Sequence, residues 1–421
     1  MVLERHGHET NLDNSRLLGE SIQMPFSRRI TKSRFLKAVM SEYMASWDKD
    51  NPSKSGIPSD RLVRLYEKWG QAEYGMIVTG NVMIHPEQLE APGNAILYAP
   101  NETPERMEQF RRMSAAGKVG GSLMIMQISH PSRQVPVFIN PNPLGASDVK
   151  LIDQVMLVDL MDRIYGKPTP LDKAGILEIV DQYSYATETA YRTGFDGIQL
   201  HGAHGYLIAQ FLSRTTNNRT GEYGGSIKHP EEVAELCEEL EALKIDFVEL
   251  SGGTYEELGW KHDEWAPRES TKKREAFFAA FAKGISPRLT KTVPYLTGGF
   301  RSAAGMVDTI KSGMCWGIGI ARPGDSDRML PSEIVQGRVS EATDVKLPPE
   351  DIITTILATG VQMESMARGI PVLDLSDPKE VIRFKDAAQI NHKKKFFKLL
   401  QGIMDIGYFV LEPSIAGNND D

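Results

Sequence analysis

Short apolar runs alternate with longer amphipathic stretches along most of the chain. The runs have the length of buried strands, whereas the stretches between them repeat their apolar residues with the period of an α-helix. Strands are predicted at residues 35–40, 76–79, 122–127, 197–200, 247–250, 293–296 and 317–320. Helices are predicted between them, at residues 61–73, 105–116, 173–193, 230–243, 272–282 and 302–312. This alternation predicts an α/β fold with a parallel sheet and crossover helices.

The pattern changes at both ends of the chain. Residues 1–20 are polar and are predicted to form a flexible tail. Residues 21–330 hold the alternating strands and helices. Residues 331–421 show only helical stretches, at 349–367, 378–390 and 395–406, and then a polar end. We interpret this last part as a C-terminal helical extension that packs on the sheet, with a separate small domain as the alternative, because Pro and Asp between the helices allow a linker.

Composition excludes several classes of protein. The chain has 421 residues, of which 41% are hydrophobic and 25% charged, as in ordinary globular proteins. The net charge is −8, and the one basic block is 393–395, so no nucleic-acid partner is expected. No apolar run approaches the ~18 residues that span a bilayer, and the N-terminus lacks a signal-peptide core. We therefore expect no membrane association and a cytoplasmic location, where Cys237 and Cys315 would be reduced thiols.

The most informative segment is the run 201–227, HGAHGYLIAQFLSRTTNNRTGEYGGSI, which directly follows the predicted strand 197–200. A β/α barrel places its active site at the carboxyl ends of such strands. His201 and His204 have an HxxH spacing, but they straddle a strand end and a loop, and no carboxylate or cysteine cluster stands nearby to complete a metal site. No metal is therefore expected. Two neutral imidazoles instead offer paired donors for an oxygen that gains negative charge.

Two further side chains fit a ligand site at the strand ends. Tyr206 follows the histidine pair, and its hydroxyl is a weak acid suited to protonating a carbanion, although a tyrosine in the wall of a pocket would leave the same pattern. Gln127 ends an apolar run, where a buried amide without a hydrogen-bonding partner is costly.

Phosphate binding is indicated after the last two strands. Gly298 and Gly299 stand where a strand turns into a helix, and backbone N–H groups at a helix N-terminus attract anions. Arg322 follows the next strand within Ala321-Arg322-Pro323, and its guanidinium can bind a phosphate through two N–H groups. These loops are the common phosphate site of β/α barrels. No G-x-G-x-x-G motif follows a strand, so no separate dinucleotide-binding domain is expected.

The run 201–227 resembles the signature of the Old Yellow Enzyme family of flavin-dependent reductases, and the resemblance covers residues 20–375. It implies a TIM-type (β/α)8 barrel at residues 21–330 that binds FMN. The implied reaction takes hydride from NADH or NADPH and reduces an activated C=C bond of a small-molecule substrate. The chain is most similar to fungal NADH-dependent flavin oxidoreductases, some of which serve specialised metabolism. Barrels of this type can form homodimers, and the sequence shows no decisive interface pattern.

The resemblance also implies roles for individual residues. His201 and His204 would hold the carbonyl or phenolate oxygen of the ligand, Tyr206 would protonate the α-carbon, and FMN would deliver hydride to the β-carbon. Tyr43 would face the substrate. The residues expected to bind FMN come from the ends of five strands and are Ala38, Val39, Met40, Ser41, Gly80, Gln127, Gly298, Gly299, Ala321 and Arg322.

The chain departs from the family pattern between Ser226 and Asp246. Only nineteen residues lie there, enough for one helix, where the family has a helix, a strand and another helix. Strand five is therefore predicted to be absent, together with the basic side chain that it places against the N1 and O2 edge of the flavin. Barrel closure links strand number, tilt and shear, so the loss predicts a gap or a seven-stranded barrel. Smaller departures are Gly221, where the family has Asp, and Ser132, where it has Gly.

Two explanations of the short region remain open: a segment missing from the encoded chain, for instance through a misread gene boundary, or a natural shortened variant. The short region supports one alternative for function, a barrel that has lost FMN binding and has no catalytic activity. A second alternative is an NADH oxidase that passes electrons to oxygen.

Overall fold

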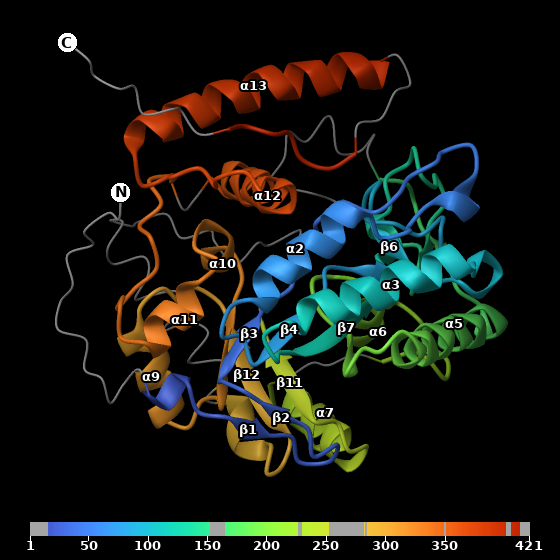
Figure 1. The fold of residues 1–421 in the computed structure, drawn as a ribbon. Helices are drawn as coiled ribbons and strands as arrows, with labels where there is room; N and C mark the ends of the chain where they lie inside the picture. The colour runs from blue at the N-terminus through green and yellow to red at the C-terminus, as the bar shows by residue number, and fades with distance from the viewer. Residues whose placement is uncertain are drawn as a thin grey trace.

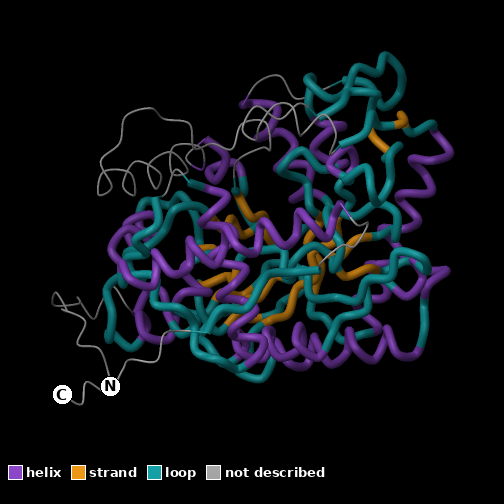
Figure 2. Tube along the Cα trace, turned by 90° about the horizontal axis from the view of Figure 1, so that it is seen from above, coloured by secondary structure: helices purple, strands orange, loops and turns teal. Residues whose placement is uncertain are grey.

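The computed structural model describes residues 16–151, 165–225, 230–251, 282, 284–348, 351–400 and 406–412. Strands lie at the centre of the molecule, and helices surround them (Figures 1 and 2). The predicted helix at 272–282 falls almost wholly outside the described residues.

Seven parallel strands form the central sheet. They are β3 (Phe35–Lys37), β4 (Met76–Val78), β7 (Leu123–Ser129), β10 (Gly197–Leu200), β11 (Phe247–Leu250), β12 (Val293–Thr297) and β13 (Gly317–Ile320). Their order is β10-β7-β4-β3-β13-β12-β11, which is the order of a barrel wall. Two short strands, β5 (Val82–Met83) and β6 (Ala95–Ile96), extend the sheet beyond β4 along β7. All seven predicted strands are confirmed, and so is the β/α barrel.

Helices cover the outside of the sheet, namely α2 (Asp60–Gly70), α3 (Pro104–Gly117), α5 (Lys173–Arg192), α7 (Pro230–Ala242) and α9 (Ala303–Lys311). Four of them begin at a side chain that accepts a backbone N–H of the first turn, from Ser59, Thr103, Asp172 and Ser302. The short helices α6 (Leu207–Leu212), α10 (Pro323–Ser326) and α11 (Leu330–Val335) lie in segments where we predicted no helix, because six residues or fewer show no clear period.

The barrel wall is open between β10 and β11. Each of these strands pairs on one side only, and the described residues between them contain no strand. The edge is also less covered than the rest of the wall: Leu200 is 50% exposed, whereas every residue of β13 is buried. The structure thus shows a seam where strand five was predicted to be absent.

A hairpin lies at the amino-terminal end of the barrel. Its strands are β1 (Ile22–Gln23) and β2 (Ile30–Thr31), which pair antiparallel, and Figure 1 shows them below the sheet. Ile22 and Met24 pack with apolar side chains of the barrel interior, so the hairpin closes this end. It also touches both sides of the seam. Arg29 forms an ion pair with Asp196 before β10, and Asp246 before β11 accepts backbone N–H groups of the hairpin loop.

The C-terminal part lies against α2. Helix α12 (Ile352–Arg368) contacts it, and the buried carboxylate of Glu364 binds Arg61 of α2 and Arg368 of its own helix. At the other end of the chain, Leu18 is fully buried although it belongs to the predicted tail, of which residues 1–15 lie outside the described residues. The division at residues 20 and 330 stays a prediction.

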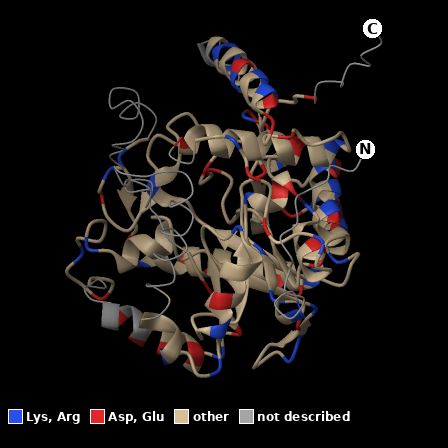
Figure 3. Cartoon of the chain, turned by 90° about the vertical axis from the view of Figure 1, so that its left-hand side faces the viewer, with Lys and Arg blue, Asp and Glu red and all other residues tan. Residues whose placement is uncertain are grey.

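Helix α13 (Pro378–Leu400) runs along the top of Figure 1 as one continuous helix. The prediction of two helices, at 378–390 and 395–406, was wrong in this respect. Residues 391–394 contain neither Pro nor Gly, so nothing interrupts the backbone hydrogen bonds. Figure 3, in which Lys and Arg are blue and Asp and Glu are red, shows charged residues of both signs along this helix. Among the described residues, no helix is long and apolar enough to cross a membrane.

Candidate active site

The predicted site residues lie at one end of the barrel. Ala38 follows β3, Gly80 follows β4, His201 follows β10, Gly298 follows β12 and Ala321 follows β13. Because the strands are parallel, their carboxyl ends share one rim of the barrel. The structure therefore brings the predicted positions to the same rim.

The two histidines and the tyrosine contact one another. The ring centres of His201 and His204 are 5.2 Å apart, and those of His201 and Tyr206 are 4.5 Å apart. His204 has a φ of 55°, a left-handed conformation that turns the loop back over the strand end. Burial lowers the pKa of His201 to about 3, with a smaller contribution from His204. His201 is therefore a neutral imidazole at ordinary pH.

Tyr206 sits at the N-terminus of α6 and is 2% exposed. The side-chain amide of Asn81 donates to its hydroxyl at 3.4 Å, which is a long hydrogen bond. Asn81 is oriented in turn by Ser129, whose hydroxyl donates to Oδ1 of Asn81 at 2.7 Å. The tyrosine hydroxyl is thus placed by groups that follow β4 and end β7.

Glu90 is a member of the site that the sequence did not reveal. Its carboxylate accepts hydrogen bonds from Ser41 at 3.0 Å, from Asn81 at 2.6 Å and from the hydroxyl of Tyr43. Because the one hydroxyl proton of Ser41 points to Glu90, Ser41 offers only lone pairs to a ligand. No pattern marks Glu90, since it lies in an irregular loop between β5 and β6.

The C-terminal segment also reaches the rim. The hydroxyl of Tyr408 donates to the carbonyl of Ser41 at 3.2 Å, and its ring lies 5.6 Å from that of Tyr43. Tyr43 has a φ of 53°, so the loop after β3 turns sharply where the two rings meet. A contact over more than 360 residues has no local sequence signal.

Gly80 lies where two segments approach closely. Its N–H donates to Glu42 and also lies within hydrogen-bond distance of the Tyr66 hydroxyl, both at 2.9 Å. A Cβ on Gly80 would lie 2.0 Å from a carboxylate oxygen of Glu42 and 2.6 Å from the carbonyl oxygen of Met40. The loop after β3 and the end of β4 can therefore pack this closely only around glycine.

Replacement of Gly80 by Ala is expected to lower the free energy of unfolding by about 1–3 kcal/mol, because the added methyl group overpacks a buried contact with the backbone of Met40. Urea denaturation measures the change. Gly221→Ala is the matched control, since a Cβ at Gly221 meets nothing within 4 Å and its φ is not left-handed. Equal stability of the two variants would contradict the close approach.

Gln127 lies inside the barrel with an unsatisfied oxygen. Its Nε2 donates to Oε1 of Gln199 at 2.7 Å, whereas its own Oε1 is buried and has no hydrogen-bond partner among the described residues. Beyond Gln199 the chain of polar groups continues to Glu249 and Thr297. A buried acceptor without a donor indicates a missing ligand group.

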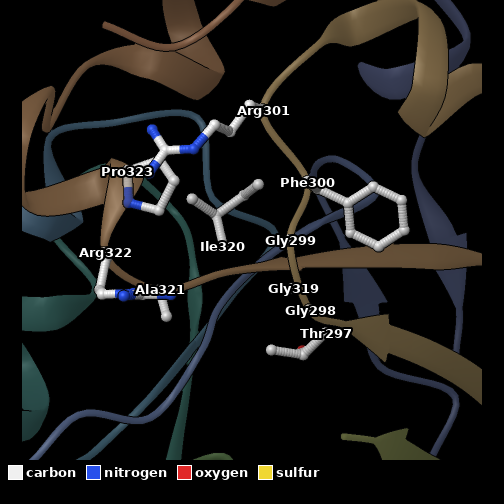
Figure 4. Close-up of a pocket in the computed structure, with 10 residues that line it drawn as sticks. All are labelled: Thr297, Gly298, Gly299, Phe300, Arg301, Gly319, Ile320, Ala321, Arg322 and Pro323. Atoms are coloured by element: carbon white, nitrogen blue, oxygen red, sulfur yellow. The ribbon is translucent and has the colours of Figure 1, made fainter. Parts of the chain in front are cut away.

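A pocket lies between the ends of β12 and β13 (Figure 4). It is lined by Gly298 and Gly299, and by the side chains of Arg301 and Arg322. The two glycines have φ values of 149° and 73°, which lets the backbone turn with little cover over its N–H groups. Backbone donors and two guanidinium groups together suit an anion such as phosphate.

Two polar residues within apolar strands were overlooked in the sequence. Gln199 in GIQL and Glu249 in FVEL occupy strand positions whose neighbours are apolar. A polar side chain inside a buried run was the signal that singled out Gln127, and it could have identified both.

The comparisons with known proteins agree on one family. A model of the NADH:flavin oxidoreductase / NADH oxidase family matches residues 26–231. The NADH-dependent flavin oxidoreductase nadA of Aspergillus parasiticus is 38% identical over 417 residues, covering 90% of this chain and 92% of its own. The NADH-dependent flavin oxidoreductase iccE of Talaromyces variabilis is 30% identical, covering 68% and 80%.

Solved structures show the same fold at low sequence identity. The Old Yellow Enzyme homologue of Zymomonas mobilis has a TM-score of 0.61 at 20% identity, over 78% of this chain and 95% of its own. Morphinone reductase has a TM-score of 0.59 at 19% identity, over 78% and 91%.

Proposed function

The chain belongs to the NADH:flavin oxidoreductase / NADH oxidase family and is an FMN-dependent oxidoreductase that uses NADH or NADPH, and on this premise we propose that it reduces an activated C=C bond of an enone-type substrate. The observation that supports this reaction is the contact of His201, His204 and Tyr206 at the rim of the barrel.

The residues present fit FMN. The unpaired Oε1 of Gln127 matches a donor on the pyrimidine ring, and the pocket between β12 and β13 suits the phosphate. Val39 and Met40, which follow β3, are half-buried apolar residues that offer apolar surface to a planar ring. When bound, FMN accepts hydride from NAD(P)H and delivers it to the β-carbon of the acceptor.

The histidine pair holds the oxygen of the substrate. An enone carbonyl gains negative charge as the β-carbon receives hydride, and N–H donors aimed at that oxygen stabilise the charge. His201 is neutral, so it acts as a hydrogen-bond donor and does not supply the proton. Tyr43 is linked to Tyr206 through Glu90 and Asn81, and we assign it to the substrate side of the site.

Tyr206 supplies the proton to the α-carbon. Its phenol is a weak acid, and the amide of Asn81 donates to the oxygen, which stabilises the tyrosinate left after transfer. Because the ring is buried, bulk water does not compete for the site. This positioning gives Tyr206 the role of general acid in the proposed reaction.

The first experiment is to bind FMN and to compare acceptors. The purified protein with FMN supplied is expected to retain a flavin absorption band after gel filtration. Under anaerobic conditions NADH should then be consumed beyond the equivalent that reduces bound FMN only when an enone such as 2-cyclohexenone is present. A protein that binds FMN but consumes NADH with oxygen alone would be an NADH oxidase. A folded protein without flavin would favour the non-catalytic barrel, which the seam between β10 and β11 makes the second candidate.

A further inference from the structure

The seam between β10 and β11 is bridged by side chains. Nε2 of Gln199 on β10 donates to Oε2 of Glu249 on β11 at 2.7 Å. Glu249 also accepts, through Oε1, the hydroxyl of Thr297 at the end of β12 at 2.6 Å. On the other side, Gln199 accepts from Gln127 of β7. Four side chains therefore connect four strands across a gap that has no backbone ladder.

The hydrogen bonds of this network all point toward Glu249, which accepts from Gln199 on one side and from Thr297 on the other. An ionised carboxylate only accepts, so Gln199 must turn its NH₂ group toward Glu249. The Oε1 of Gln199 then faces Gln127, which must turn its own NH₂ group toward Gln199. The remaining atom of Gln127 is therefore Oε1, an acceptor, and this buried atom has no partner within the part of the chain that the structure describes.

The acceptor oxygen of Gln127 can pair with the pyrimidine edge of a flavin in a way that a donor group at this position could not. The pyrimidine edge of an oxidised flavin carries a single N–H group, at N3, between two carbonyl groups. An amide held with Oε1 forward accepts that hydrogen bond, whereas the same amide reversed would leave both N–H groups facing each other. The direction of these hydrogen bonds is thus a feature that selects the ligand.

We propose that Gln199 and Glu249 are positioning residues that bridge the seam and hold the Gln127 amide with its oxygen toward the N3–H group of FMN. The inference rests on the proposed function in that FMN occupies the site. Neither residue touches the flavin in this role: Glu249 orients Gln199, and Gln199 orients Gln127. The seam is thereby linked to cofactor recognition through the side chains that border it.

The charge of Glu249 sets the conditions for a test. Burial raises the pKa of Glu249, while the hydrogen bonds from Thr297 and Gln199 and the charge of Lys37 oppose that rise. The binding measurements are therefore repeated at increasing pH, because a higher pH favours the carboxylate form.

The test compares two flavins. Apoprotein is titrated with FMN and with 3-methyl-FMN, in which a methyl group replaces the N3 hydrogen, and binding is followed by quenching of flavin fluorescence. The new amide in Glu249→Gln can turn either its oxygen or its NH₂ group to Gln199, so the direction of the hydrogen bonds is no longer fixed. We expect this variant to lose about tenfold in affinity for FMN and less than about twofold for 3-methyl-FMN. Gln199→Met removes the hydrogen bonds of this side chain without a change of charge, and it should show the same selectivity for FMN over 3-methyl-FMN.

Glu241→Gln is the matched control. This carboxylate also accepts hydrogen bonds, from Thr290, Lys291 and Thr292, but it lies on α7 outside the barrel. The Glu241→Gln variant should leave the affinities for FMN and for 3-methyl-FMN unchanged. An equal loss for both flavins in Glu249→Gln and Gln199→Met would mean that these residues only hold the barrel together, and no loss would also overturn the proposal.

Failure of the proposed function gives a different result. A wild-type protein that binds neither flavin lacks the cofactor site and overturns both claims, whereas FMN binding that does not depend on Glu249 overturns only this one. If wild type does not bind 3-methyl-FMN because of its methyl group, wild type and Glu249→Gln are compared by the Raman band of the N3–H bend of bound FMN. Its shift on transfer to D₂O should then differ between wild type and Glu249→Gln.

Discussion

Replacement of Tyr206 by Phe is expected to slow enone reduction by about 10²–10⁴-fold while leaving the reduction of bound FMN by NADH near the wild-type rate. A positioned general acid contributes a factor of this size, and only the second half-reaction needs the proton. The aromatic ring remains and keeps its contact with His201, so the site should stay packed. Anaerobic stopped-flow spectroscopy of the flavin band measures the two half-reactions separately.

The control for this prediction is Tyr183→Phe. Tyr183 lies on α5, away from the barrel rim, and its buried hydroxyl makes no hydrogen bond within the described part of the chain. Both half-reactions should be unchanged in this variant. Equal slowing of both half-reactions in Tyr206→Phe would show that Tyr206 shapes the site and does not donate the proton.

Acid is expected to destabilise the protein through His130 by about 1.4 kcal/mol per pH unit between pH 6.5 and pH 3. Burial lowers the pKa of His130 to about 3 from 6.5. In this range the unfolded chain binds a proton at this residue and the folded chain does not. The stabilising contribution is therefore complete above pH 6.5 and is lost as the pH falls, by roughly 5 kcal/mol in total. His201 has the same shift, but it belongs to the active site.

Asp325 changes the free energy of unfolding with pH in the opposite direction to His130, so the effect of His130 must be measured as a difference between wild type and a variant. Burial raises the pKa of Asp325 to about 7, and its protonation stabilises the folded chain as the pH falls from 7 toward 3.8. Comparing wild type with His130→Asn at each pH cancels this contribution. The variant should gain stability relative to wild type at lower pH, as measured by urea denaturation. A constant difference between pH 6.5 and pH 4 would contradict a neutral buried His130.

The barrel was predictable because its signals are local. Each strand is a short apolar run between helical stretches, and the predicted and observed bounds of the run at 197–200 agree. The strand ends placed Gly80, His201 and Gly298 on one rim, because parallel strands leave little freedom there. The roles of these residues remain proposals, since they came from a family resemblance.

Other features depend on contacts that the sequence does not mark. Glu90 enters the site only because Ser41 and Tyr43 from the loop after β3 and Asn81 after β4 converge on it. Tyr408 arrives from the far end of the chain. The length of α13 was misjudged for a different reason: its polar middle section weakens the apolar period without breaking the backbone.

The open wall between β10 and β11 changes the mechanics of the barrel. A closed ring of strands has no ends, so a displacement of one strand is resisted from both sides. In this chain β10 and β11 are each held from one side, and the described links across the seam are the hairpin below and the Gln199–Glu249 contact above. Small outward movements of these two strands meet less resistance than elsewhere in the wall. The barrel wall is therefore most easily deformed at β10, the strand that His201 follows, close to the point where the substrate oxygen would bind.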